Sequence, residues 1–299
     1  MEIHQFKYFV AVAETGGFSK AAKRCYVAQP SLSQQIIKLE QELGHELFER
    51  LGRRVILTEA GKALLPRARN ILRETNYIKT GMVSELDSCA GVLSVGFIPT
   101  IAPYLLPGTL KRCSLQLPEA EIAVNENLTP NLLQSLTTLD IDLAIMSLPI
   151  ESKLINTESL FNDPLVLAVS RDHELASKKS VNVADLKHIP FIALDEEHCL
   201  GEQIKNFCYE KQVSPQILCR TWNLSTIQHC VSYGNGIALV PEMMVLADSS
   251  VDCVYRNIRG QSPSRAVVAA WHKERKPSRL AREFISILKD EHERLTGDR

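Results

Sequence analysis

Apolar residues near the start of the chain recur with the period of an α-helix. The first such run ends at Gly16 and has one apolar face, formed by Phe6, Phe9, Val10 and Ala13. A short second run covers residues 19–25 and precedes QPSLSQQIIKLEQELG, where one face again collects the apolar positions: Leu32, Ile36, Leu39 and Leu43. Pro30 suits the first turn of this third helix, and Gly44 suits its end. The pattern predicts three short helices in the first 44 residues.

The exposed face of the third predicted helix is polar but carries almost no charge. Its positions are Gln29, Pro30, Ser31, Ser33, Gln34, Gln35 and Lys38. Amide and hydroxyl side chains near a helix N-terminus suit base edges and phosphates in a DNA major groove. A helix, a turn and a second helix with such a face form the helix-turn-helix arrangement. A helical hairpin with a polar surface is the alternative.

The segment FERLGRRVILTEAG predicts a small β-wing. Gly52 stands in a tight turn, and residues 55–57 have the composition of a strand. Arg50, Arg53 and Arg54 cluster around the turn, where their side chains can reach phosphates or a narrow minor groove. We therefore add Arg50 and Arg53 to the residues expected to contact DNA.

A long helix is predicted after Thr58. Apolar positions then recur every three or four residues, as in a coiled-coil seam: Leu64, Ala68, Ile71, Thr75, Ile78, Met82 and Leu86. Such a seam predicts a dimer, which would present two recognition helices to a two-fold DNA site. The alternative is a helix that packs on its own chain.

These segments resemble a known family. FSKAAKRCYVAQPSLSQQIIKLEQELGHELFER, followed by RRVILTEAGKALL, is similar to the N-terminal domain of LysR-type transcriptional regulators. The resemblance implies an α+β multidomain protein: a winged helix-turn-helix DNA-binding domain at 1–58, a linker and dimerisation helix at 59–89, and an effector domain at 90–299. The effector domain is expected to contain two Rossmann-like α/β subdomains, as in periplasmic binding proteins, at about 90–162 with 268–299, and at 163–267.

The last two hundred residues independently alternate between strand and helix patterns. GVLSVGFI, AEIAVNEN and IDLAIMSL are predicted strands separated by helices, which favours a parallel sheet covered by helices. A second series contains FIAL, QILCRTW and GIALVP. Thr100 and Thr129 directly follow two strand ends, where ligands bind in open α/β sheets. The alternative is that both threonines only cap helices.

Composition and charge agree with a soluble, cytoplasmic, two-part protein. The net charge is −1, but residues 1–73 contain 12 Lys and Arg against 7 Asp and Glu. A basic N-terminal part on an acidic remainder is typical of a nucleic-acid-binding module attached to another domain. MEIHQFKYFV has no apolar signal-peptide core, and no apolar run is long enough to span a membrane. In the cytoplasm the eight cysteines are expected to be reduced.

Two of these cysteines stand out in the stretch EEHCLGEQIKNFC. Cys199 follows His198 and opens a predicted helix, whose dipole lowers a thiol pKa, although Glu196 and Glu197 oppose that effect. Cys208 lies nine residues further, a helical rise of about 13.5 Å. A disulfide needs Cα atoms within about 4.4–6.8 Å, so the pair can bond only if the helix unwinds. The alternative is one loop cysteine and one core cysteine.

Six further cysteines are scattered along the chain, and most of them are expected to be inert core residues: Cys25, Cys89, Cys113, Cys219, Cys230 and Cys253. The pairs at 198–199 and 229–230 each join a histidine to a cysteine. Adjacent side chains seldom converge on one ion, and there is no C-x-x-C spacing. We therefore expect neither a metal site nor a cofactor.

A narrower resemblance covers nearly the whole chain. IPTIAPYLLP, NENLTPNLLQSL and EEHCLGEQIKNFC are similar to the hydrogen-peroxide-sensing branch of the LysR-type family. The resemblance implies that Cys199 is the peroxide-reactive cysteine and Cys208 the resolving cysteine. It also implies that Thr100, Thr129 and His198 line the peroxide pocket. Gly201 and Glu202 differ from the sequence that this branch has after its reactive cysteine. This difference bears on how sensitive the protein is to peroxide.

The sequence thus predicts a peroxide-responsive, DNA-binding transcriptional regulator rather than an enzyme. It is expected to activate mainly antioxidant genes through a reversible Cys199–Cys208 disulfide. The family implies these partners: double-stranded promoter DNA, hydrogen peroxide, RNA polymerase, glutaredoxin or thioredoxin as reductant, and further copies of the chain in a homodimer or homotetramer. A regulator controlled by a small metabolite in the effector cleft is the alternative. A thiol peroxidase or a solute-binding transport protein would not need the DNA-binding module.

Overall fold

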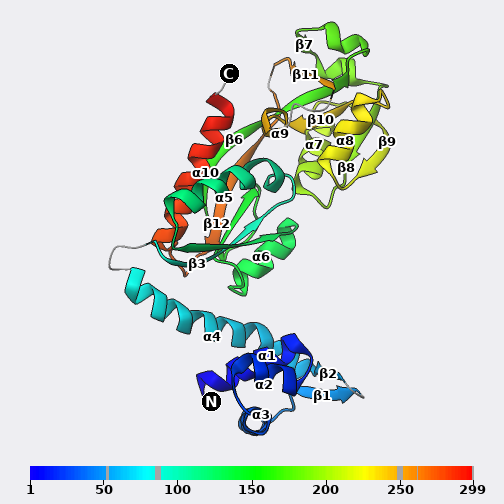
Figure 1. Ribbon diagram of the computed structural model, residues 1–299. Coiled ribbons are helices and arrows are strands. Elements are labelled where there is room, and N and C mark those ends of the chain that lie inside the picture. Colours follow the sequence, from blue (N-terminus) through cyan, green and yellow to red (C-terminus); the bar gives the residue numbers. More distant parts are fainter. Residues whose placement is uncertain (52–53, 85–88, 248–251, 261, 298–299) are drawn as a thin grey trace. The chain divides into compact units, whose positions relative to one another are not determined.

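The structure, a computed structural model, describes residues 1–51, 54–84, 89–247, 252–260 and 262–297 (Figure 1). Contacts between residues divide the chain into two units. The first comprises Met1–Ser88 with Thr138–Asp140, and the second comprises Cys89–Thr137 with Ile141–Arg299. The first unit has one hydrophobic core and the second has two.

The first unit consists of three short helices, a two-stranded wing and a long helix. In chain order these are α1 (Ile3–Thr15), α2 (Phe18–Cys25), α3 (Gln29–Leu43), β1 (Phe48–Leu51), β2 (Arg54–Leu57) and α4 (Glu59–Ser84). Phe9, Leu32 and Leu39 are fully buried, so the apolar stripes of the sequence meet in one core. β1 and β2 pair antiparallel. The helix-turn-helix and its wing are therefore present, while Gly52 and Arg53 lie outside the described residues.

Helix α4 begins where the sequence predicts. The Thr58 hydroxyl accepts a hydrogen bond from the Gly61 backbone N–H at 3.0 Å, which caps the helix. Ala68 is buried against the core of the first unit, whereas Ile78 further along is 62% exposed. The first turns of α4 therefore pack on their own chain. Further along the helix, the apolar side chain of Ile78, which belongs to the predicted seam, is exposed to solvent. Leu86 lies outside the described residues.

The second unit is built around one mixed sheet. Its order is β4-β3-β5-β12-β6-β11-β7, and β10 also pairs with β6. The strands are β3 (Gly91–Phe97), β4 (Ala120–Glu126), β5 (Leu143–Ser147), β6 (Ile155–Ser170), β7 (Ser180–Val181), β10 (Ala238–Pro241), β11 (Cys253–Ile258) and β12 (Ser264–His272). β3, β4 and β5 are parallel as predicted. Beyond these three strands the sheet is mixed, because β12 and β10 run antiparallel to their neighbours.

The long strand β6 contributes to both cores of this unit. Ile155 at the start of β6 belongs to the first core, and Leu165 belongs to the second. The register between β6 and β12 shifts between Val267 and Val268, where Leu160 of β6 is left without an opposing residue. Such a bulge bends and twists the strand. The expected subdomain limits, 162–163 and 267–268, fall inside these two strands.

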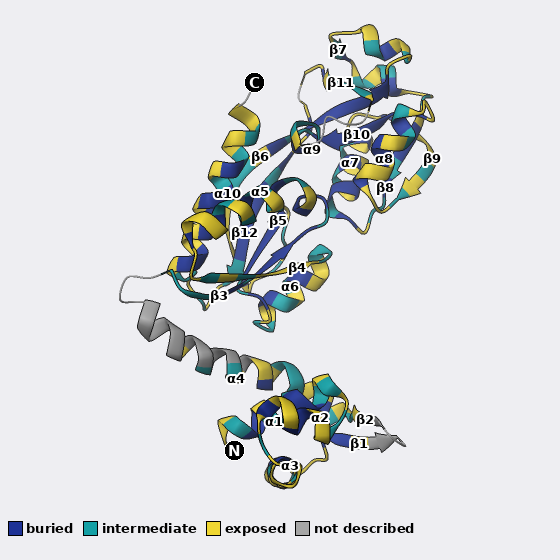
Figure 2. Cartoon of the chain, in the orientation of Figure 1, coloured by how far each residue is buried: buried dark blue, intermediate teal, exposed yellow. Residues whose placement is uncertain are grey.

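Helices cover the sheet of the first core on both sides (Figures 1 and 2). They are α5 (Ala102–Gln116), α6 (Thr129–Thr137) and α10 (Arg279–Gly297), with α9 (Glu242–Ala247) between the cores. α5 and α10 pack against each other, and α6 contacts β5, β6 and β12. Right-handed crossovers from β3 to β4 and back to β5 place α5 and α6 on opposite faces.

The second core packs around a smaller pair of parallel strands, β8 (Pro190–Leu194) and β9 (Gln216–Thr221). Its helices are α7 (Cys199–Glu210), α8 (Leu224–Ser232) and the single 3-10 turns η1 (Glu174–Ser177) and η2 (Val183–Leu186). The start of α7 lies close to the loop before it. A Cβ built on Gly201 would stand 2.3 Å from the Asp195 carbonyl oxygen, so only glycine permits this approach.

Candidate functional site

Cys199 and Cys208 lie at opposite ends of helix α7. Cys199 is the first helical residue, after His198 in the N-cap position, and Cys208 stands in the last turn. Cys199 is half-buried and Cys208 is only 3% exposed. The helix predicted between the two thiols is therefore present, and both cysteines are free.

The Cys199 thiol reaches the carboxyl edge of the large sheet. Its sulfur lies 3.1 Å from the Ser147 hydroxyl oxygen, at the end of β5. Because β3, β4 and β5 are parallel, the residues that follow them gather at the same edge, and Thr100 and Thr129 follow the other two strands. This arrangement places a thiol, at the positive end of a helix dipole, beside side-chain hydroxyls.

Thr129 and Cys199 line the same pocket. This pocket, the thiol pocket, has a volume of about 470 Å³ and is further lined by Pro149, Glu202 and Gln203. The Thr129 hydroxyl is buried and has no hydrogen-bond partner. Helix α6 begins at Thr129 itself, so the interpretation of Thr129 as an N-cap is wrong. An unpaired buried hydroxyl is costly, and a polar ligand in the pocket would satisfy it.

Thr100 belongs to a buried charged cluster instead. Arg265 donates to the Thr100 hydroxyl at 2.8 Å and to its carbonyl oxygen at 3.0 Å. The same guanidinium pairs with Asp163 at 2.8 Å, and Asp163 accepts the backbone N–H of Met243. Ile101 holds the N-cap position of α5, so the capping interpretation is wrong for Thr100 too. Thr100 is not among the described residues that line the thiol pocket.

His198 is 4% exposed and does not line the thiol pocket among the described residues. Its ring meets the Trp222 ring edge-on, with centroids 5.4 Å apart. Its Nε2 has no hydrogen-bond partner. Burial lowers the pKa of His198, while the nearby carboxylates of Asp195 and Glu197 oppose that shift. The imidazole is therefore neutral at pH 7 and contributes no positive charge beside Cys199.

We expect stability to fall as pH drops below 6.5. Burial lowers the pKa of both His198 and His292 from the ordinary 6.5. Below pH 6.5 the unfolded histidines bind protons while the folded ones remain neutral, so acid favours the unfolded state until the lower folded pKa is reached. Urea unfolding at several pH values measures this. His198→Gln should flatten the dependence, and an unchanged slope would contradict this assignment.

The charges around the Cys199 loop are compensated in part. Glu196 forms ion pairs with Lys205 and Arg220, which hold the pKa of its carboxyl below the ordinary range. These two cations therefore reduce the effect by which the Glu196 carboxylate was expected to oppose the helix dipole at the Cys199 thiol. Burial raises the pKa of the Cys208 thiol, so this thiol stays protonated at neutral pH.

Of the remaining cysteines, Cys25 and Cys113 are buried and the others are half-buried. Burial raises the pKa of Cys113 to about 11, as expected of an inert core thiol. Within the described part of the chain, no three His, Cys, Asp or Glu side chains gather closely enough to hold a metal ion.

In the first unit, α3 presents the predicted polar face. Gln29, Pro30, Ser31, Gln34 and Lys38 are exposed, and Ser33 and Gln35 are half-buried. Two of the amides are already engaged: Gln35 accepts a hydrogen bond from Gln5, and Gln29 accepts one from Ser19. The side chain of Arg50 and all of Arg53 lie outside what the structure describes.

Several residues near these sites escaped the sequence analysis. Ser147 and Arg265 touch Cys199 and Thr100 across long stretches of chain, and Gln203 donates to the Leu148 backbone carbonyl beside the thiol pocket. Tyr26, in the turn before α3, is 95% exposed. One feature of the local sequence could have pointed to Arg265: it is a charged residue at the start of an apolar strand.

Comparison with known proteins finds similarity along both units. The model of the bacterial regulatory helix-turn-helix protein of the lysR family matches residues 3–62, and that of the LysR substrate binding domain matches residues 87–293. The DNA-binding transcriptional dual regulator OxyR of Escherichia coli K12 is 37% identical over 254 residues, covering 85% of this chain and 83% of the relative.

Two further relatives cover almost the whole chain. The hydrogen peroxide-inducible genes activator of Haemophilus influenzae is 33% identical over 297 residues, covering 96% of this chain and 99% of the relative. The solved structure of a full-length OxyR variant from Pseudomonas aeruginosa matches with a TM-score of 0.77 and 29% identity, covering 98% of this chain and 95% of that one. In the described part of the chain, no helix is both long and apolar enough to cross a bilayer.

Proposed function

The chain belongs to the LysR family of bacterial transcriptional regulators, in its OxyR branch, and on that premise we propose a peroxide-responsive regulator switched by a Cys199–Cys208 disulfide. Residues 1–58 bind promoter DNA, the helix within 59–89 pairs two copies of the chain, and residues 90–299 sense peroxide. The names of the relatives support this proposal, because one is a DNA-binding transcriptional dual regulator and the other a hydrogen peroxide-inducible genes activator.

The proposed chemistry has two steps. The Cys199 sulfur attacks one oxygen of hydrogen peroxide, the O–O bond breaks, and Cys199 becomes a sulfenic acid while the other oxygen leaves as water. The Cys208 thiol then attacks the sulfenic sulfur, the S–O bond breaks, a second water leaves and the disulfide forms. A dithiol reductant such as glutaredoxin or thioredoxin returns the two electrons and two protons.

The observation that carries the proposal is the position of both thiols in one helix. Nine residues of helix separate their Cα atoms by about 13.5 Å, and a disulfide requires about 4.4–6.8 Å. The disulfide between Cys199 and Cys208 therefore cannot form while α7 remains helical. Disulfide formation must unwind the helix and repack the second core, which turns a local reaction into a conformational change that the DNA-binding units and RNA polymerase can read.

Thr129 is the group that we propose to bind peroxide in the thiol pocket. Its unpaired hydroxyl can both donate and accept, as hydrogen peroxide can, and it lines the same pocket as Cys199. The Ser147 hydroxyl stabilises the Cys199 sulfur by a hydrogen bond. We propose a supporting part for Thr100 and His198, since Thr100 fixes the buried Arg265 and His198 packs beneath Trp222.

Peptide mapping after stoichiometric peroxide tests the switch. We expect a crosslink between the peptides that contain Cys199 and Cys208, present only after treatment and removed by dithiothreitol. The paired cysteines are the only two that the proposal links, so the other six should remain alkylatable. A protein that loses its thiols to peroxide without this crosslink would rule out the mechanism.

For DNA, we propose that Gln34 reads a base edge and that Lys38 contacts phosphate. Both side chains are exposed on α3. Gln34→Ala should weaken binding to the cognate promoter by about 1–3 kcal/mol and relax sequence preference. Lys38→Ala should weaken binding to all sequences and lower the salt slope by about 1. Fluorescence anisotropy on cognate and scrambled duplexes at several salt concentrations separates the two effects, and equal losses for Gln34→Ala on both duplexes would contradict its role.

One observation favours a second candidate function. The thiol pocket, at about 470 Å³, is much larger than hydrogen peroxide requires and falls in the size range of small-molecule sites. A regulator that binds a small metabolite there would not need Cys199. The response of a Cys199 variant decides between the two.

A further inference from the structure

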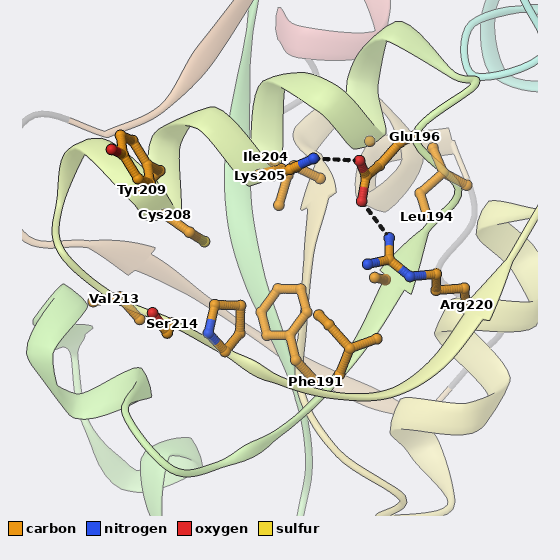
Figure 3. Close-up of a pocket in the computed structure, with 14 residues that line it drawn as sticks. Phe191, Leu194, Glu196, Ile204, Lys205, Cys208, Tyr209, Val213, Ser214 and Arg220 are labelled. Atoms are coloured by element: carbon orange, nitrogen blue, oxygen red, sulfur yellow. Dashed lines mark hydrogen bonds and ion pairs between the residues drawn. The ribbon is translucent and has the colours of Figure 1, made fainter.

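A second cavity lies on the opposite face of helix α7. Residues 202, 203 and 206 face the thiol pocket, whereas Ile204 and Cys208 face this one. The cavity has a volume of about 260 Å³. Figure 3 shows the Phe191 ring and the Cys208 side chain on facing walls, and Ala193 of β8 also lines it. We call it the α7 cavity.

Charged residues stand at one side of the α7 cavity. Glu196 lies 2.5 Å from the Lys205 ammonium and 2.6 Å from the Arg220 guanidinium (Figure 3). Lys205 is 62% exposed and Arg220 is 48% exposed, so both cations border solvent as well as the cavity. Two cations and one carboxylate leave one net positive charge beside a space whose other lining is mostly apolar, with Tyr209 and Ser214 as the polar exceptions.

Size, lining and charge together define a ligand. An apolar cavity of about 150 Å³ holds a benzene-sized molecule, so 260 Å³ suits a fused two-ring system. The net positive border favours one negative charge on that molecule. We propose that the α7 cavity binds a bicyclic aromatic monoanion and that the bound molecule holds α7 as a helix.

A ligand in the α7 cavity would affect the disulfide switch because α7 itself forms one wall of this cavity. Ile204 and Cys208 belong to α7, and Glu196 belongs to the loop that leads into Cys199. Unwinding α7 removes one wall, so the ligand binds the helical form only. This part rests on the proposed disulfide switch. At nine times its dissociation constant, the ligand should lower the equilibrium constant for disulfide formation about tenfold.

Binding is tested on the reduced full-length protein by calorimetric titration with 2-naphthoate. We expect one saturable site, and binding at least about tenfold weaker for the cation 2-naphthylmethylammonium. Ala193→Phe fills the cavity and should abolish binding, while Ala184→Phe, at an exposed position, should not change it. Glu196→Gln removes the competing carboxylate and should tighten binding. Absent binding up to about 1 mM, or binding untouched by both cavity variants, would overturn the proposal.

A second readout does not involve peroxide. Because Cys208 lines the α7 cavity, 2-naphthoate should slow alkylation of Cys208 by N-ethylmaleimide about tenfold at nine times its dissociation constant, with peptide mass mapping to identify the thiol. Unchanged alkylation at saturation places the ligand elsewhere and overturns the site. Binding and protection with no peroxide-induced disulfide would instead refute the switch and leave the site standing.

Discussion

Replacing Cys199 with serine is expected to reduce peroxide-induced transcription to the uninduced level. A serine hydroxyl keeps the hydrogen bond to Ser147 and the start of α7, but it does not form a sulfenic acid with peroxide. A reporter gene in cells that contain only the variant measures the response, and mass spectrometry of the purified variant should find no peroxide-dependent disulfide.

Two matched variants make this result specific. Cys208→Ser should still form the sulfenic acid at Cys199, which dimedone traps, yet give no intramolecular disulfide. Cys219→Ser, at a half-buried thiol in β9, should respond like the unaltered protein. A full peroxide response from Cys199→Ser would instead favour the regulator controlled by a small metabolite.

Asp163→Ala is expected to cost about 3–5 kcal/mol of unfolding free energy, the largest effect that we foresee on stability. Arg265 and Asp163 are 0% and 1% exposed, and their side chains lie 2.8 Å apart. Removing the carboxylate leaves a buried guanidinium without its counter-charge and leaves the Met243 N–H without its acceptor. Urea unfolding followed by circular dichroism gives the difference.

The surface pair Lys289–Glu158 is the control for that measurement. Its oxygen–nitrogen distance is 2.6 Å, but the side chains are 35% and 47% exposed, so Glu158→Gln should cost only about 0–1 kcal/mol. Adding Arg265→Met to Asp163→Ala should restore part of the loss, because the unpaired charge is then gone. A loss below about 1 kcal/mol for Asp163→Ala alone would show that solvent reaches the cluster.

The parts of the fold that the sequence predicts are those held by local periodicity. The stripe through Leu32, Ile36 and Leu39 and the buried strands β3 and β5 each carry their signal within a few residues. The first half of β6 carries no such signal, since its pattern is mostly polar and partly exposed. Its pairing with β12 joins residues about a hundred positions apart, and no local pattern encodes that pairing.

The candidate site divides in the same way. The helix between Cys199 and Cys208 follows from local sequence, and so does the position of Thr129 after a strand. The contacts that define the site do not: Ser147 is 52 residues from Cys199, and Thr100 is 165 residues from Arg265. Only the three-dimensional course of the sheet brings these side chains together, which is why sequence analysis missed Ser147 and Arg265.

The pairing of β6 with β12 also determines where the chain can be divided into fragments. A fragment that ended at residue 162 would keep half of β6 and lose β12, so β5 would become an open edge. An uncovered strand edge is a template for aggregation. We therefore expect a fragment that ends at residue 162 to aggregate, and tags or inserted reporter domains belong in the loops outside residues 155–170 and 264–272.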